Sequence, residues 1–245
     1  GGGNDQWVGN NTFNGVTQIT NSGSARLRLA NTSGDQFAND VTFTNTGSSL
    51  IQPAFNGSST FSGNITVNST AGTGVQFGAG VGTWTLAATK TLNIGGSGFS
   101  VGTLLIQNFT QLGGTSQNLT LSGTAILTLG TAGDFSGNVN FSSPQLYLNG
   151  VIFRGTASLE KTGATSNTSD GGNTFMGVTS IKNSGSNFLR LALNTGDTFN
   201  DNVTFTSSGS SLIDPAYAGT NVFSGNIIVN STGSSTGIQF GVNGG

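Results

Sequence analysis

The chain has 245 residues, of which 41 are Gly, and only 7% are charged, with 7 Lys and Arg against 9 Asp and Glu. It contains no His and no Cys, which excludes disulfides, metal sites of the Cys/His type and the common nucleophile–base catalytic pairs. The net charge of −2, carried by scattered residues, predicts no nucleic-acid partner, and no apolar run is long enough to predict a membrane span.

Short segments of alternating apolar and polar residues recur along the chain and predict β-strands. In chain order the clearest are residues 27–29, 41–43, 65–67, 119–121, 127–129 and 146–148. A period of two is typical of strands with one buried side, and no segment shows the spacing of a helix. Clusters of Asn, Ser, Thr and Gly lie between the strands and suit tight turns, because Gly and Asn tolerate positive φ.

An aromatic residue leads each of these units and defines a short repeat. The lead positions are Phe13, Phe37, Phe61, Trp84, Phe109, Phe135, Phe153, Phe175, Phe199 and Phe223. They are 18 to 26 residues apart, and the stretch 81–134 departs most from the pattern. A regular period of about 23 residues favours stacked coils over a sandwich or a barrel, with equivalent residues about 4.8 Å apart along the axis. We therefore expect the lead rings to form an internal ladder.

A longer repeat contains the short one. Residues 11–19 recur as 173–181, and the match at a shift of 162 residues continues to Phe77 and Phe240 with one insertion. The chain thus holds a first repeat, about 9–170, and part of a second repeat, 171–245. We predict an all-β fold: one continuous parallel β-solenoid over 1–245, with about ten coils of two or three strands each. Because the only Met is Met176, we also expect a processed or partial chain.

Some polar residues alternate with apolar ones and are expected to point outward. These are Thr17, Thr42, Thr66, Thr179 and Thr204, together with the equivalent pair Arg28 and Arg190. We interpret the two arginines as solvated cations, with a sugar or partner contact as the alternative.

The acidic residues are the only candidates for catalysis, because β-helical polysaccharide lyases and hydrolases need clustered carboxylates or a basic pair. The closest groups are Asp35 with Asp40 and Asp197 with Asp201. Asp35 and Asp197 are equivalent and each follows a Gly, which is typical of an Asx turn, with a calcium ligand or a catalytic carboxylate as the alternatives. We predict no catalytic, cofactor-binding or metal residue and no cofactor, and leave weak calcium binding near Asp35 and Asp197 open.

Residues 173–179 and 195–205 resemble repeats of very large secreted surface proteins of Gram-negative bacteria. The repetitive β-solenoid adhesin-like or fibre proteins of Bacteroidota are the most similar in style, and autotransporter passengers and filamentous-haemagglutinin stalks are similar more loosely. The resemblance covers essentially the whole chain. It implies export to the cell surface, a fibrous or stalk role in adhesion or a biofilm matrix, and no enzyme activity.

Three functions compete at this stage. The leading hypothesis is an extracellular structural filament or stalk, and the second is a carbohydrate-binding or polysaccharide-cleaving β-helix. Ice binding is the third, since Thr42-x-Thr44 and Thr204-x-Thr206 occur, but the coils of Phe61 and Phe135 lack the second Thr. We expect the last coil to be continued end to end, by further repeats of the chain or by another molecule, with a surface polysaccharide as a further partner class.

Overall fold

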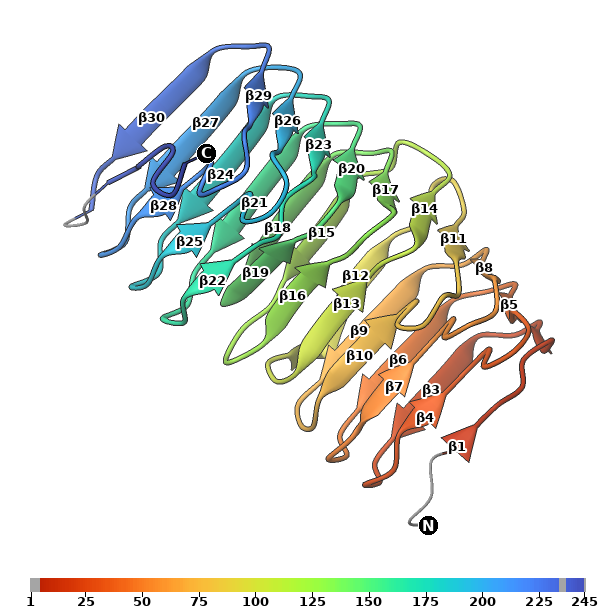
Figure 1. Ribbon diagram of the computed structural model, residues 1–245. Helices are drawn as coiled ribbons and strands as arrows, with labels where there is room; N and C mark the ends of the chain where they lie inside the picture. The colour runs from red at the N-terminus through yellow and green to blue at the C-terminus, as the bar shows by residue number, and fades with distance from the viewer. Residues whose placement is uncertain (1–4, 234–236, 245) are drawn as a thin grey trace.

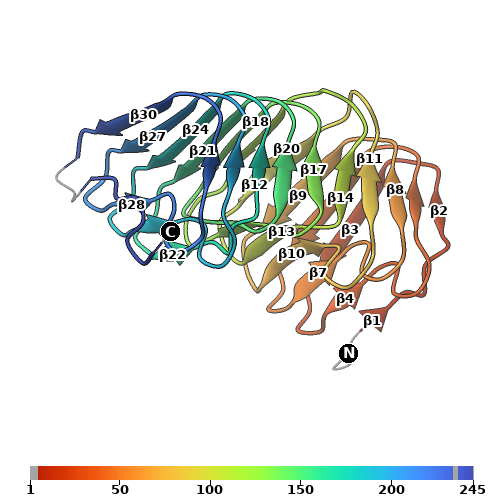
Figure 2. The same cartoon turned by 45° about the horizontal axis from the view of Figure 1, so that its top comes forward.

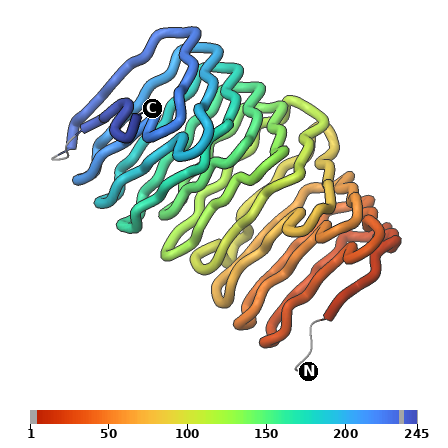
Figure 3. The backbone as a smooth tube through the Cα atoms, in the orientation of Figure 1, coloured from red at the N-terminus to blue at the C-terminus, as the bar shows by residue number. Residues whose placement is uncertain are grey.

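The short strands and Gly/Asn turns fold into coils that stack along one axis, as the computed structural model shows for residues 5–233 and 237–244 (Figure 1). Each full coil contributes one parallel strand to each of three faces, and the described residues contain no helix. The described ends of the chain lie at opposite ends of the stack, as the tube in Figure 3 makes clear. Ten strands on the first face correspond to about nine turns, which confirms the predicted parallel β-solenoid.

The first face is a ten-stranded sheet that carries all the lead residues, and its strands form one row in Figure 2. It consists of β2 (Thr12–Phe13), β5 (Gln36–Phe37), β8 (Ser59–Phe61), β11 (Trp84–Leu86), β14 (Phe109–Gln111), β17 (Gly133–Phe135), β20 (Val151–Phe153), β23 (Thr174–Phe175), β26 (Thr198–Phe199) and β29 (Val222–Phe223). Ring stacking is closest to parallel near the ends: Phe175 and Phe199 have centroids 4.7 Å apart and planes 3° apart.

The aromatic ladder is interrupted in the middle, where two lead assignments were wrong by two residues. Trp84 lies in register with Ser59, and Phe109 lies in register with Trp84. Leu86 and Gln111 therefore occupy the lead column above Phe61, and both are buried. The Trp84 indole compensates by packing edge-on against Phe61 and stacking on Phe77.

The second face is built from a four-stranded and a six-stranded sheet. The first comprises β3 (Thr17–Asn21), β6 (Val41–Asn45), β9 (Ile65–Ser69) and β12 (Leu92–Phe99); the second comprises β15 (Gln117–Thr120), β18 (Val139–Ser143), β21 (Ala157–Lys161), β24 (Thr179–Asn183), β27 (Val203–Ser207) and β30 (Ile227–Ser231). Pairing stops after β12, whose register shifts between Ile94 and Phe99. Gln117 bridges the break, because its Oε1 accepts the Leu92 N–H at 2.8 Å.

The third face is built from a seven-stranded and a three-stranded sheet. The first comprises β1 (Asp5–Gln6), β4 (Leu27–Arg28), β7 (Leu50–Gln52), β10 (Gly74–Phe77), β13 (Thr103–Ile106), β16 (Ile126–Leu129) and β19 (Gln145–Leu148); the second comprises β22 (Asn167–Thr168), β25 (Leu189–Arg190) and β28 (Ile213–Asp214). Apolar side chains from all three faces fill one continuous core.

The outward orientation predicted for the threonines is confirmed for Thr42, Thr66 and Thr204, which are partly exposed on the outer surface of the second face. It is wrong for Thr17 and Thr179, because these residues pair with the inward Val41 and Val203. Each hydroxyl donates to the carbonyl two residues earlier at 3.0 Å, so a Thr can begin an inward column without leaving its hydroxyl unpaired.

Stacking brings backbone atoms of successive coils so close that some positions admit only Gly. A Cβ atom on Gly196 would overlap the carbonyl oxygen of Thr220 in the next coil, and one on Gly34 would overlap that of Ser58. The regular spacing of Gly before the lead residues therefore reflects close approach between coils.

Candidate functional site

Polar side chains two residues before the lead residues form a short, partly buried column near each end of the stack, and Trp84, Phe109, Gly133 and Val151 occupy the position between them. Asp197 Oδ1 accepts hydrogen bonds from the backbone N–H of Asn173 at 2.9 Å and from the Asn173 side-chain amide at 2.8 Å, and these bonds join two adjacent coils. The Asp197 N–H in turn donates to Asn221 Oδ1 at 2.7 Å. Asp197 is thus fully buried and links three coils, so the interpretation of its carboxylate as an Asx-turn group is wrong.

The first repeat contains the same arrangement. Asp35 Oδ1 accepts the backbone N–H and the side-chain amide of Asn11 at 3.0 and 2.8 Å, and the Asp35 N–H donates to Ser59 Oγ. The second carboxylate oxygen of each Asp is buried without a hydrogen-bond partner. Within residues 5–233 and 237–244, no group of three His, Cys, Asp or Glu side chains is arranged to hold a metal ion. Both carboxylates are directed at the neighbouring coil.

Burial changes the pKa of the Asp197 carboxyl group. It raises the pKa of the Asp197 carboxyl to about 6, while the two hydrogen bonds from Asn173 act in the opposite direction. A carboxylate with one unsatisfied buried oxygen is costly, and protonation relieves that cost.

Lys161 is a second buried ionisable group, inward on β21 with no exposed surface. Its Nζ donates to the carbonyl oxygens of Gly163 and Asn187 at 2.7 and 2.9 Å, in its own turn and the next coil. The side-chain amide of Asn183, in the next coil of this column, also donates to the Asn187 carbonyl. Burial lowers the pKa of the Lys161 ammonium to about 8.

Most other acids also connect neighbouring coils. Three form ion pairs: Asp134 with Arg154 at 2.7 Å, Glu160 with Lys182 at 3.1 Å, and Asp214 with Arg190 at 2.8 Å. Asp40 accepts the backbone N–H of Asn64, and Asp170 accepts the side-chain amide of Asn194. These hydrogen bonds and ion pairs join one coil to the next.

The equivalent residues Arg28 and Arg190 lie on the outer surface of the third face, as predicted, but neither is a fully solvated cation. The Arg28 guanidinium lies 3.8 Å from the ring centroid of Phe55. The Arg190 guanidinium lies over Phe188 and Tyr217, at 4.0 and 4.3 Å. Apart from the equivalence of the two arginines, no pattern in the sequence indicated this stacking.

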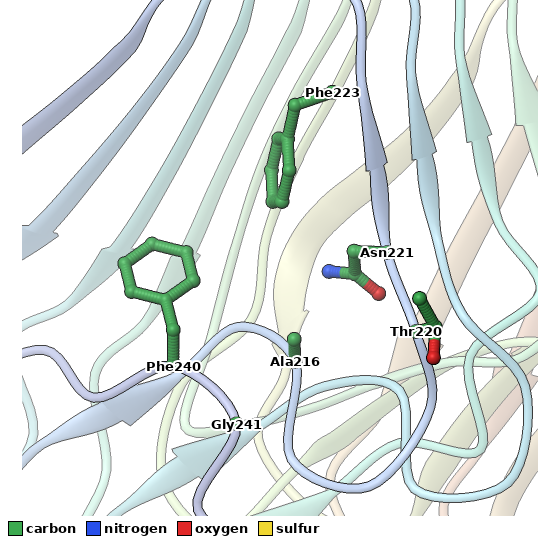
Figure 4. Close-up of a pocket in the computed structure, with 6 residues that line it drawn as sticks. All are labelled: Ala216, Thr220, Asn221, Phe223, Phe240 and Gly241. Carbon is green, nitrogen blue, oxygen red and sulfur yellow. The ribbon is translucent and has the colours of Figure 1, made fainter. Parts of the chain in front are cut away.

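The last described coil ends in an aromatic socket, which we define as the hollow between Phe223 and Phe240 (Figure 4). Its volume is about 300 Å³, and it is lined by Ala216, Thr220, Asn221, Phe223, Phe240 and Gly241. The inward residues of β30 beside it, Ile227 and Val229, are 43% and 50% exposed. Their equivalents in the first repeat, Ile65 and Val67, are fully buried under the following coil.

Comparisons with known proteins identify no relative: no family model, no curated protein and no solved structure matches this chain. Among the described residues there is no helix of the length and apolar character needed to cross a membrane.

Proposed function

We propose that this chain is a non-enzymatic structural component of an extracellular filament or stalk, in which coils stack end to end. The aromatic socket carries the proposal. Its two rings, Phe223 and Phe240, have centroids 6.1 Å apart and planes 73° apart. The equivalent rings Phe61 and Phe77 have the same spacing, 6.1 Å, at 71°.

In the first repeat that space is filled by the next coil. The Trp84 ring lies 5.8 Å from Phe61 and 4.7 Å from Phe77, and both phenylalanines are buried. No ring among the described residues fills the aromatic socket, and Phe240 is 43% exposed. The socket therefore has the geometry of an interior coil junction, and no coil within residues 5–233 and 237–244 fills it.

The occupant we propose is the first coil of another molecule of this chain. Stacked in register, its Phe13 would continue the lead column above Phe223, and its Asn11 would continue the polar column above Asn221. The bond from the Asp197 N–H to Asn221 Oδ1 shows that an Asn of the following coil can accept this polar contact. A head-to-tail contact of this kind does not close on itself and produces filaments.

The alternatives from the sequence have less support. A polysaccharide-cleaving β-helix needs clustered carboxylates that can meet the substrate, whereas one member of each candidate pair, Asp35 or Asp197, is buried between coils. Ice binding needs regular rows of Thr, and the outer surface of the second face instead carries the ion pair of Glu160 and Lys182 in β21 and β24.

Sedimentation velocity over a wide range of protein concentration tests the proposal. We expect end-to-end association of the native chain and its loss in Val229→Asp, which places a charge on the inward side of the open coil. Ile228→Asp is the matched control, because Ile228 is 49% exposed but pairs with the outward Thr204. A native chain that stays monomeric throughout, or an equal loss of association in both variants, would contradict axial stacking.

A further inference from the structure

Equivalent positions on the outer surface of the third face carry different charges in the two repeats. In the second repeat, Arg190 Nε donates to Asp214 Oδ2 at 2.8 Å, and Phe188 and Tyr217 pack against the guanidinium. Asp214 is 1% exposed, so this cluster is a desolvated, charge-neutral ion pair.

In the first repeat the carboxylate is missing. Arg28 Nε donates to Gln52 Oε1 at 2.8 Å, so a neutral amide stands where the second repeat has Asp214. Phe55 takes the place of Tyr217 against the guanidinium. At the position equivalent to Phe188 the first repeat has Arg26. Arg28 lies in β4, and Arg26 directly precedes that strand, so the two arginines are two residues apart. Among the described residues, no carboxylate lies within ion-pair distance of either guanidinium group.

These two arginines differ from most other surface cations in having no ion pair with an acidic residue in the described part of the chain. Arg26 Nε is buried and has no hydrogen-bond partner. Burial and the charge of Arg26 lower the pKa of the Arg28 guanidinium. Arg154, Lys182 and Arg190, by contrast, each have an acidic partner on a neighbouring coil. Two neighbouring guanidinium charges repel each other, and an external anion bound at the surface would offset that repulsion.

We propose that Arg26 and Arg28 form a binding site for a carboxylate of an acidic polysaccharide. The contact of Asp214 with Arg190 shows the ligand chemistry that the equivalent position accepts, and a planar carboxylate matches the donor fork of a guanidinium. We call Arg26, Arg28 and Gln52 the arginine site. It is independent of axial stacking, because it lies on a side of the solenoid and not on its end.

The surroundings favour a sugar chain over an acidic peptide. β4 lies between β1 and β7, so its backbone groups are engaged in the sheet and offer no edge to a peptide strand. The residues in register with Arg28 are Gln6 and Gln52, whose amides can both donate to and accept from hydroxyl groups.

The experiment measures retention of the native chain on immobilised polygalacturonate, on its fully methyl-esterified form and on polyglutamate. We expect salt-sensitive binding to the uronate polymer and at least about tenfold weaker binding to the other two, since esterification removes the charge that the guanidinium groups recognise. Equal binding to polyglutamate would overturn the assignment to a polysaccharide, and no binding to polygalacturonate would overturn the site.

Two double variants exchange equivalent residues between the two repeats. Arg26→Phe combined with Gln52→Asp gives the arginine site the composition of the second repeat, and we expect it to lose binding while keeping its melting temperature. Phe188→Arg combined with Asp214→Gln does the reverse, and we expect it to add a second site and strengthen retention. Unchanged binding in the first variant would overturn the proposal; if that variant does not fold, unchanged retention in the second would do so.

Discussion

Single buried side chains decide how the stability of this solenoid depends on pH. Asp197 is the clearest case, because its pKa is raised from 3.8 to about 6 by burial. The folded state therefore holds a proton that the unfolded state has released between these values. The contribution of Asp197 to the free energy of unfolding is therefore highest below pH about 4 and declines as the pH rises to about 6, by up to about 1.4 kcal/mol per pH unit.

Asp197→Asn is expected to abolish this decline and to stabilise the fold at neutral pH. The substitution keeps an oxygen that accepts from Asn173 and removes the buried charge, and Asn already occupies the neighbouring positions 173 and 221 of the column. Urea unfolding of both proteins at a series of pH values between 4 and 7 measures the difference. Parallel pH profiles would show that Asp197 does not carry the effect.

Lys161 predicts the opposite trend at alkaline pH. Its pKa is lowered from 10.5 to about 8, so between these values the unfolded state binds the proton and the folded state does not. Stability contributed at this position consequently rises with pH across that window. We expect the native chain to gain stability relative to Lys161→Met between pH 8 and 10, measured by thermal unfolding. A stability difference that does not change with pH would contradict the prediction.

Sequence reasoning missed these inward groups because it treats an Asp or a Lys as a surface residue unless a partner is evident. A usable signal was present for Asp197: Asn11, Asp35, Ser59, Asn173 and Asn221 all stand two residues before a lead Phe. Recurrence at one position of a stacked coil indicates a column, and a polar column can be buried when its members bond along the axis. Lys161 also lies in a recurrent polar column. Ser143, Asn183 and Ser207 are in register with it, and Asn21, Asn45 and Ser69 form the corresponding column in the first repeat.

At the scale of the element, the sequence predicted the strands and their repeat period correctly. It predicted less well which side of a strand faces the core and which residue holds the lead position. Thr17 and Thr179 were assigned to the wrong side because the adjacent Val16 and Val178 look like the buried partners. Both valines are instead exposed, at 75% and 48%. Trp84 and Phe109 were displaced by two residues because an aromatic residue in an irregular coil was equated with the lead position. Alternation fixes which residues share a side of a strand, but packing against the next coil decides which side is inward.

The regular part of the aromatic ladder gives an element-scale prediction. Phe199 is 1% exposed and stacks on Phe175 and Phe223 at 4.7 and 5.0 Å. Phe199→Asp should destabilise the fold by more than the about 3–5 kcal/mol typical of truncating a buried Phe, because it also buries an unpaired charge. Phe199→Leu, which keeps the site apolar, should cost much less.

The loss should also be local, because each coil contacts only its neighbours. Hydrogen exchange of Phe199→Asp is expected to show faster exchange in β23, β26 and β29, while β5 and β8 keep their protection. A melting curve identical to that of the native chain would mean that Phe199 does not support the ladder. Uniform loss of protection would show instead that the stack unfolds as one cooperative unit.

At the scale of the whole molecule, the same parallel pairing that joins one coil to the next defines what a filament would look like. Every described coil repeats the strand separation along one axis, and the aromatic socket presents an interior junction at one end. If axial stacking continues between molecules, strands lie across the fibre and their spacing of about 4.8 Å becomes its axial period. Native material should therefore form long, thin fibres in electron micrographs and give a meridional diffraction reflection near that spacing.

The side chains at the junction make this prediction specific. Val229→Asp should prevent the fibres, because Val229 pairs with the buried Phe205 and faces inward, whereas Ile228→Asp should leave them intact. Fibres that show the axial reflection but also form from Val229→Asp would indicate lateral association through the faces of the solenoid. Globular native particles without an axial reflection would exclude a filament built by stacking coils, while leaving the binding test of the arginine site unaffected.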